Sequence, residues 1–151
     1  LNSAEIKRLK RKINATCVVY REGNDKIHDR AQVLIMDTVG HLSRIYAHCN
    51  LAYVGGGLSH SGLHNILEPS IFGLPVLIGP IHNKFPEALD LVRLGGVLVT
   101  KKSADIIYHL EKLLCHPSAY EKMGSINKKY IQKMSGATAQ ITELLEKDIR
   151  F

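Results

Sequence analysis

Residues 53–85 constrain the fold of this chain more than any other stretch. An apolar run at 51–54 ends at a triple glycine, 55–57, and an apolar periodic segment extends from 64 to 73. A second short apolar run, Val76 to Ile78, follows directly. The order of apolar run, glycine loop, periodic segment and apolar run predicts a strand, a loop, a helix and a strand, which is one βαβ unit.

The glycine loop and the start of the following helix predict an anion site. Gly55, Gly56 and Gly57 let the backbone turn with positive φ and leave main-chain N–H groups open to a ligand. The predicted helix points its N-terminus at the same space, where phosphate is the most plausible anion. Asn65 and Glu68 stand three apart at its start and share a face, so the carboxylate can accept hydrogen bonds from two ribose hydroxyls. The same residues also have simpler structural interpretations. The glycines can form only a tight turn, Asn65 can be a helix N-cap, and Glu68 can be an acid that the helix dipole stabilises.

The loop is neither GxGxxG nor a P-loop, because it lacks those spacings and the GK[ST] ending. The pattern therefore predicts a nucleotide or sugar-phosphate site without naming a dinucleotide or an ATPase. His64, next to the loop, is a candidate donor to a phosphate or a sugar carboxylate, with an ordinary loop histidine as the alternative. His60 and His64 do not predict a metal site, because Gly62 separates them and no third ligand has suitable spacing.

The rest of the chain alternates between strand and helix patterns. The predicted helices cover 3–14, 42–48, 84 or 86 to 92, 104–114 and about 118–151, the last loosened at Gly124 and interrupted at Ser135-Gly136, and the other strands cover 15–20, 33–36 and 97–100. This alternation predicts an α/β fold, a Rossmann-like parallel sheet with helices on both faces. With 151 residues we expect a single domain, 1–151, with one core.

The chain begins with Leu and shows no signal segment, so we expect it to be a piece of a longer protein. No apolar run approaches the roughly 20 residues of a membrane span. Three cysteines without metal-ligand spacing favour free thiols in a reducing compartment.

The net charge of +6 indicates anionic partners. Five of the cations, Lys7, Arg8, Lys10, Arg11 and Lys12, lie in the first predicted helix. They form either a solvated helix face or a patch for an anionic membrane or nucleic acid. No aromatic residue interleaves with them and no nucleic-acid motif is present, so we do not expect nucleic acid as a partner.

The sequence also resembles a known family. The run GGG…G-x-HN-x-LEP-x-x-x-G-x-P-V-x-x-GP…N-x-F is similar to the C-terminal, donor-binding domain of bacterial 3-deoxy-D-manno-octulosonic acid (Kdo) transferases, which are GT-B glycosyltransferases. Residues 37–42 resemble the DT-x-G-E-L segment of that family, with His41 where Glu is usual. The resemblance implies the C-terminal half of a GT-B fold, cut from a two-domain protein.

The resemblance also assigns residues to the donor, cytidine monophosphate (CMP)-linked Kdo. It implies nucleotide contacts from Val39, Gly40 and His41, and contacts to the CMP part from Asn65, Ile66, Leu67 and Glu68. The loop residues Gly55, Gly56, Gly57 and His64, together with Asn83 and Lys84 of the N-x-F match, complete the predicted donor site. Asn83 is also a candidate cap for the helix that follows it.

The implied activity is transfer of Kdo from CMP-Kdo to a lipid A precursor in lipopolysaccharide biosynthesis. The implied location is the cytoplasmic face of the Gram-negative inner membrane, with peripheral membrane contact by the full-length protein. The family's general base belongs to the N-terminal domain, so no catalytic residue is expected in this chain and little activity from it alone. No cofactor and no metal are expected. The alternatives are a GT-B domain for another donor, such as a UDP-sugar, and a nucleotide-binding module without catalysis.

Overall fold

The computed structural model describes residues 3–20, 30–59 and 62–148. The chain divides into two compact units, Leu1–Leu42 and Ser43–Phe151. Each unit is described by itself, and one domain over all 151 residues stays a prediction.

The first unit contains one helix and two strands. Helix α1 covers Ser3–Lys12, and strands β1, Cys17–Tyr20, and β2, Val33–Met36, pair in parallel with Cys17 opposite Val33. Ile6 of α1 and Ile35 of β2 are buried, so the unit has a small apolar interior. The β-branched and apolar residues of both strands form strands as predicted.

The second unit is a three-stranded parallel sheet with helices. Its strands are β3, Ala52–Val54, β4, Val76–Ile78, and β5, Val97–Val99, in the order β3-β4-β5. Its helices are α2, Leu42–Tyr46, which begins at the last residue of the first unit, α3, Leu67–Ile71, α4, Pro86–Leu94, α5, Ser103–Cys115, α6, Pro117–Met134, and α7, Ala137–Asp148. Every strand pair in both units is parallel, which confirms the predicted strand direction. The described strands nevertheless form two sheets, one in each unit.

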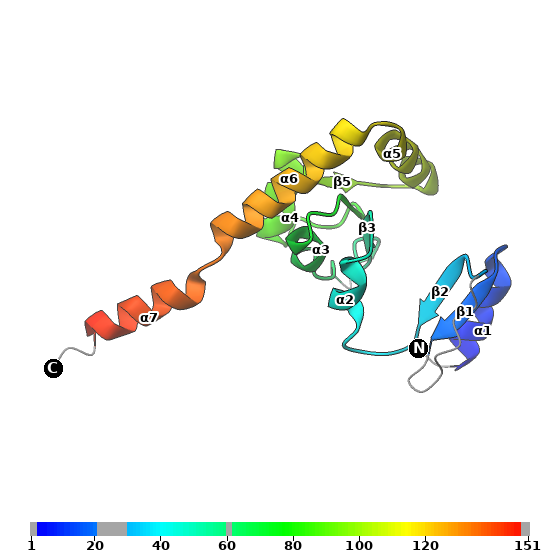
Figure 1. Cartoon of the computed structure of the whole chain (residues 1–151), viewed down its shortest axis with the longest axis horizontal. Helices are drawn as coiled ribbons and strands as arrows, with labels where there is room; N and C mark the ends of the chain where they lie inside the picture. Colours follow the sequence, from blue (N-terminus) through cyan, green and yellow to red (C-terminus); the bar gives the residue numbers. More distant parts are fainter. Residues whose placement is uncertain (1–2, 21–29, 60–61, 149–151) are drawn as a thin grey trace. The chain divides into compact units, whose positions relative to one another are not determined.

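The central strand β4 buries both of its faces. Val76 and Ile78 pack with Ala88 and Leu91 of α4, while Leu77 packs on the other side with residues of α5 and α6. Successive side chains of a strand point to opposite faces, so α4 covers one face of β4, and α5 and α6 cover the other. Figure 1 shows these helices around the strands of the unit. The predicted α/β class with helices on both faces is confirmed.

Two element boundaries differ from the prediction. Helix α3 begins at Leu67 and not at 64 or 65, so it is only five residues long. Helix α6 continues through Gly124, where a broken or loosened helix was predicted. Gly124 is buried against the carbonyl oxygen of Gly73 and has no room for a Cβ. A glycine that permits close packing can lie inside a helix when tertiary contacts stabilise that helix.

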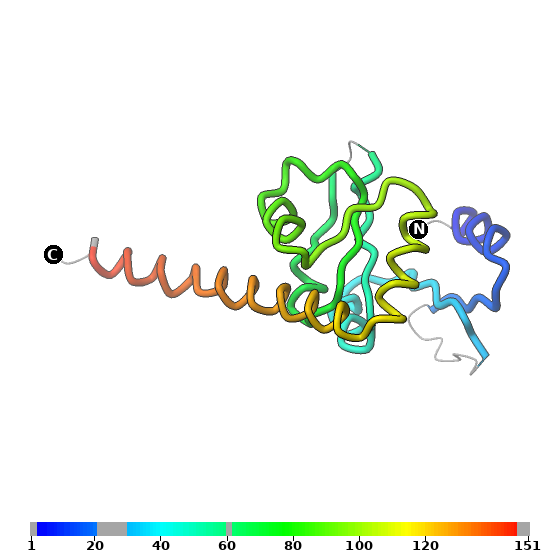
Figure 2. The backbone as a smooth tube through the Cα atoms, turned by 90° about the horizontal axis from the view of Figure 1, so that it is seen from above, coloured from blue at the N-terminus to red at the C-terminus, as the bar shows by residue number. Residues whose placement is uncertain are grey.

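The predicted separation at Ser135-Gly136 is confirmed. Gly136 has a φ of +103°, a conformation that L side chains rarely adopt, and α7 starts directly after it. Residues 137–147 are all exposed. Figure 2 shows the backbone of α7 beyond the end of α6. Within the described residues, no helix is long and apolar enough to cross a bilayer.

Candidate functional site

The glycine loop after β3 is held by close backbone contacts. Gly56 has a φ of +88°, and a Cβ there would overlap the carbonyl oxygen of Gly62, so only glycine fits. Gly57 lies against Gly79 of the loop after β4, and the Ile81 N–H donates to the Gly57 carbonyl oxygen over 2.9 Å. The triple glycine therefore joins the loops that follow two neighbouring strands.

His64 returns the chain to this loop. Its N–H donates to the Gly55 carbonyl oxygen over 3.0 Å, and its exposed ring lies beside Gly55 and Gly56. The structure thus places His64 beside the glycine loop, as predicted. An exposed ring there is positioned to donate to an anion bound over the loop.

Asn65 and Glu68 form a hydrogen-bonded pair. Asn65 Nδ2 donates to Glu68 Oε1 over 3.0 Å, and Asn65 Oδ1 accepts from the Leu67 N–H over 2.9 Å. The shared face is confirmed, but Asn65 precedes α3 and does not lie within it. Because α3 has only five residues, its aligned peptide dipoles are fewer than the sequence predicted, and loop N–H groups carry more of any anion binding.

Tyr46 of α2 lies beside this pair and was missed by the sequence interpretation. Its ring contacts that of Phe72 with centroids 6.3 Å apart. Burial raises the pKa of the Tyr46 phenol. Electrostatic interactions with Glu68 and with Cys49 raise this pKa further. No local sequence pattern links Tyr46 to Glu68, so only the fold reveals this neighbour.

The remaining predicted residues of the second unit differ in exposure. Ile66 is 1% exposed and belongs to the core, so it can offer a ligand only its backbone. Asn83 and Lys84 are exposed in the turn closed by the Phe85 N–H and the His82 carbonyl oxygen. Asn83 does not cap α4, contrary to the prediction, because Phe85 is the N-cap residue and Pro86 the first residue of the helix. Proline suits that position, since its missing N–H would have no helical partner.

Val39, Gly40 and His41 lie in the first unit, in the loop after β2. Val39 is 96% exposed, and Gly40 has a φ of +87°. The His41 ring packs edge-on against Tyr20 with centroids 5.8 Å apart, so this side chain has a packing role where the family usually has Glu. The hydroxyl of Thr38, in the same loop, is buried without a hydrogen-bond partner among the described residues.

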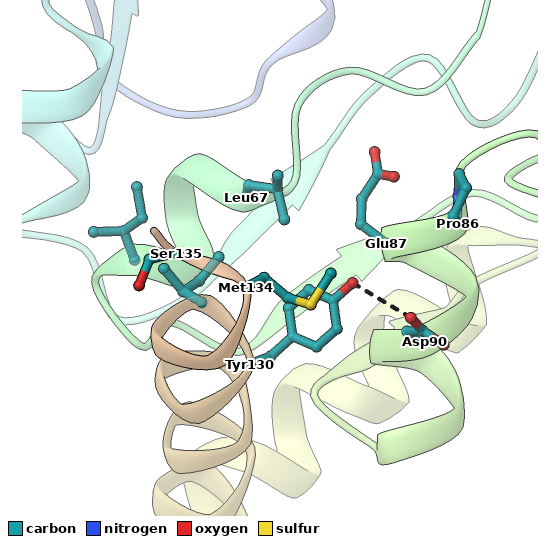
Figure 3. A pocket seen from close by; sticks show the side chains of 9 residues that line it. Leu67, Pro86, Glu87, Asp90, Tyr130, Met134 and Ser135 are labelled. Carbon is teal, nitrogen blue, oxygen red and sulfur yellow. Dashed lines mark hydrogen bonds between the residues drawn. The ribbon is translucent and has the colours of Figure 1, made fainter. Parts of the chain in front are cut away.

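An apolar pocket of about 470 Å³ is lined in part by Leu67, the first residue of α3. It lies between α3, α4 and α6, and the Tyr130 hydroxyl at its wall donates to an Asp90 carboxylate oxygen over 3.4 Å (Figure 3). Burial and the charge of Asp90 raise the pKa of Tyr130. The carboxylates of Glu87 and Asp90 line this pocket and would repel a phosphate. We therefore expect a phosphate at the glycine loop and not in this pocket.

The part of the chain that the structure describes holds no group of three or more His, Cys, Asp or Glu side chains arranged for a metal ion. His60, half of the histidine pair considered above, lies outside the described residues. All three cysteines are free thiols in the structure, Cys115 exposed and Cys17 and Cys49 half-buried.

Comparisons with known proteins identify what this arrangement resembles. The chain is 32% identical over 130 residues to the 3-deoxy-D-manno-octulosonic acid transferase of Haemophilus influenzae, covering 85% of this chain and 30% of that protein. It is 29% identical over 115 residues to the transferase of the same name from Bordetella pertussis, covering 76% of this chain and 27% of that protein. No protein-family model matches the chain.

A solved structure is also similar. The crystal structure of the C-terminal CMP-Kdo binding domain of WaaA from Acinetobacter baumannii matches with a TM-score of 0.75 and 27% identity. The match covers 85% of this chain and 67% of that one.

Parallel sheets, the glycine loop and these similarities define the chain as a glycosyltransferase domain with the fold of the C-terminal half of the GT-B class. Within that class, its sequence and fold match the C-terminal domain of the Kdo transferases, which confirms the resemblance seen in the sequence. The chain spans about 30% of the length of the curated relatives it matches.

Proposed function

We propose that this chain is the donor-binding part of a glycosyltransferase that transfers Kdo from CMP-Kdo to a lipid A precursor in Gram-negative lipopolysaccharide biosynthesis. The full-length protein would work at the cytoplasmic face of the inner membrane, in peripheral contact with the bilayer. Support comes from the similarity to Kdo transferases and to a domain that binds CMP-Kdo.

The observation that carries the proposal is the pair of Asn65 and Glu68 at the start of α3. The Asn65 amide fixes Glu68 through Oε1, which leaves Oε2 to accept from ribose hydroxyls. The CMP phosphate would then bind over the glycine loop, near the exposed ring of His64, and the exposed Lys84 is a candidate for a further cationic contact. For Val39, Gly40 and His41, nucleotide contacts remain a prediction from the family resemblance.

The chemistry proposed for this chain is stabilisation of the leaving group. CMP leaves as a phosphate monoester, so backbone N–H groups and nearby cations would favour transfer by binding the developing negative charge. That role requires neither a metal nor another cofactor. Transfer also requires a general base close to the acceptor hydroxyl, and we place that base outside this chain. We therefore propose that the chain binds the donor and catalyses little alone.

Titration calorimetry of the chain with CMP, UMP and inorganic phosphate tests the donor site. We expect CMP to bind more tightly than UMP. Glu68→Ala should weaken CMP binding by about tenfold to a hundredfold, because hydrogen bonds to a charged group contribute about 1.5–3 kcal/mol. Glu121→Ala, which removes an exposed carboxylate of α6, should leave the affinity unchanged.

The other outcomes separate the competing functions. Tighter binding of UMP than CMP would favour a UDP-sugar enzyme. Tight CMP binding that Glu68→Ala leaves intact would place the nucleotide away from the pair and contradict the proposed site.

A further inference from the structure

The outer face of α1 carries the highest density of positive charge among the described residues. Its five cations, Lys7, Arg8, Lys10, Arg11 and Lys12, are all exposed, and Glu5 is the only acid of the helix. Ile6 is the only buried residue of α1. At 100° per residue the cations spread over an arc of roughly 200°, whose middle lies about 140° from Ile6 and whose nearest member, Lys10, lies about 40° from it. We call these five side chains the α1 basic face.

The cations of the α1 basic face repel one another. Lys7 and Arg11 stand four residues apart, as do Arg8 and Lys12, and like charges at this spacing destabilise a helix. A single carboxylate, that of Glu5, accompanies the five cations on α1. The helix therefore keeps a large excess of positive charge, and an anionic surface against the face would remove the repulsion.

We propose that the α1 basic face docks on the anionic headgroups of a lipid bilayer. Five cations on a helix about 15 Å long form a convex array that can contact several headgroups at once. Leu9 is 40% exposed but lies about 60° from Ile6 around the helix, on its apolar side, so the proposed contact with the headgroups is electrostatic. A nucleic-acid surface fits less well, because no aromatic side chain lies among the cations to stack on bases. The proposal rests on the proposed function in that the acceptor there is a membrane lipid.

Vesicle co-sedimentation of the 151-residue chain tests this directly. The vesicles contain either phosphatidylcholine alone or equal parts of phosphatidylcholine and phosphatidylglycerol. We expect binding only to the second kind, weakening as salt is added. Lys7→Gln/Arg11→Gln should weaken that binding about 30-fold, because each cation near an anionic surface contributes about fivefold in affinity. Glutamine retains helix propensity, and circular dichroism checks that the variant is folded.

A matched variant and two further measurements make the result decisive. Lys112→Gln/Lys122→Gln removes the same charge from exposed positions of α5 and α6 and should change vesicle binding by less than about twofold. Equal losses in both variants, no binding to phosphatidylglycerol vesicles, or tighter binding to a single-stranded RNA oligonucleotide would overturn the proposal. CMP titration of the α1 variant separates the two proposals. Retained CMP binding with lost vesicle binding supports both, whereas vesicle binding by a chain that never binds CMP overturns the donor site alone.

Discussion

At the scale of single residues, the three consecutive glycines have three different roles. Gly55 has an ordinary φ, and a Cβ there would meet only the His64 ring at 3.6 Å. Gly56 combines positive φ with a close backbone neighbour, and Gly57 touches Gly79 across two loops. The sequence identified the triplet as one flexible loop, but only Gly56 needs the conformational freedom of glycine, and Gly57 needs its small size.

This difference predicts how alanine substitutions rank. Gly55→Ala should change the free energy of unfolding by less than about 1 kcal/mol, because ordinary van der Waals contact costs little. Gly56→Ala should lower it by at least about 2 kcal/mol through left-handed strain together with steric overlap. Urea denaturation followed by circular dichroism measures both variants.

Gly57→Ala should fall between the other two, because a Cβ there would meet Gly79 at 3.0 Å with no change in φ region. The same urea denaturation measures the free energy of unfolding of this variant. If Gly55→Ala proved the most damaging of the three, the backbone geometry described here would be wrong. If Gly55→Ala is stable but loses CMP, the ligand approaches the loop at Gly55.

The sequence predicted the pair at the start of α3 better than its surroundings. Asn65 and Glu68 are three residues apart, so local geometry alone brings them together. Tyr46, by contrast, approaches Glu68 only because α2 and α3 pack with Tyr46 beside Phe72. Asn83 was predicted as a cap from its residue type, but Pro86 sets the start of α4 and moves the cap to Phe85.

At the scale of elements, strands and helix ends with local signals were predicted well. β2 and β4 have the predicted bounds, and Gly95 ends α4 with a φ of +84° as a C-terminal glycine should. The prediction that the helix is broken or loosened at Gly124 was wrong, because the sequence shows the glycine but not the Gly73 carbonyl oxygen that packs against it. Element type followed from periodicity, whereas continuity of α6 depends on tertiary contact.

Helix α6 is tied to the sheet by one buried side chain. Asn127 is 0% exposed, and its Nδ2 donates to the Leu74 carbonyl oxygen over 2.7 Å and to the Gly96 carbonyl oxygen over 3.0 Å. These carbonyls precede β4 and β5, so a single amide connects α6 to two strands.

Asn127→Asp should therefore destabilise the second unit strongly. The carboxylate would lose both donated bonds and face two carbonyl oxygens, so we expect a loss of about 3 kcal/mol or more in unfolding free energy at neutral pH. As a control, Gln132→Glu adds the same charge at an exposed site of α6 and should cost less than about 0.5 kcal/mol. Thermal and urea unfolding of both variants would compare them, and similar stabilities would show that the amide does not hold α6.

At the scale of the whole molecule, the residues predicted to contact the donor are divided between the two units. Val39, Gly40 and His41 belong to the first, and the glycine loop and the Asn65–Glu68 pair to the second. The pattern of residues predicted the second segment as an anion and ribose site, whereas the nucleotide contacts of the first segment followed from the family resemblance, since periodicity alone does not relate residues so far apart. The matched part covers 30% and 27% of two of the relatives, so the chain corresponds to a minor share of those enzymes.

A chimera with the Haemophilus influenzae transferase tests the division of labour between donor binding and chemistry. In it, this chain replaces the matching 130-residue region of the relative. Because we place the general base outside this chain, the chain alone should form no product from CMP-Kdo and a lipid A precursor, while the chimera should transfer Kdo at a rate detectable by mass spectrometry. Glu68→Ala in the chimera should lower the rate at limiting CMP-Kdo by about tenfold or more, because it weakens donor binding.

Turnover by the chain alone would place a base within it and contradict the proposed division. A chimera that binds CMP but never transfers Kdo would show that this donor domain serves a different sugar, since donor and acceptor halves would both be present.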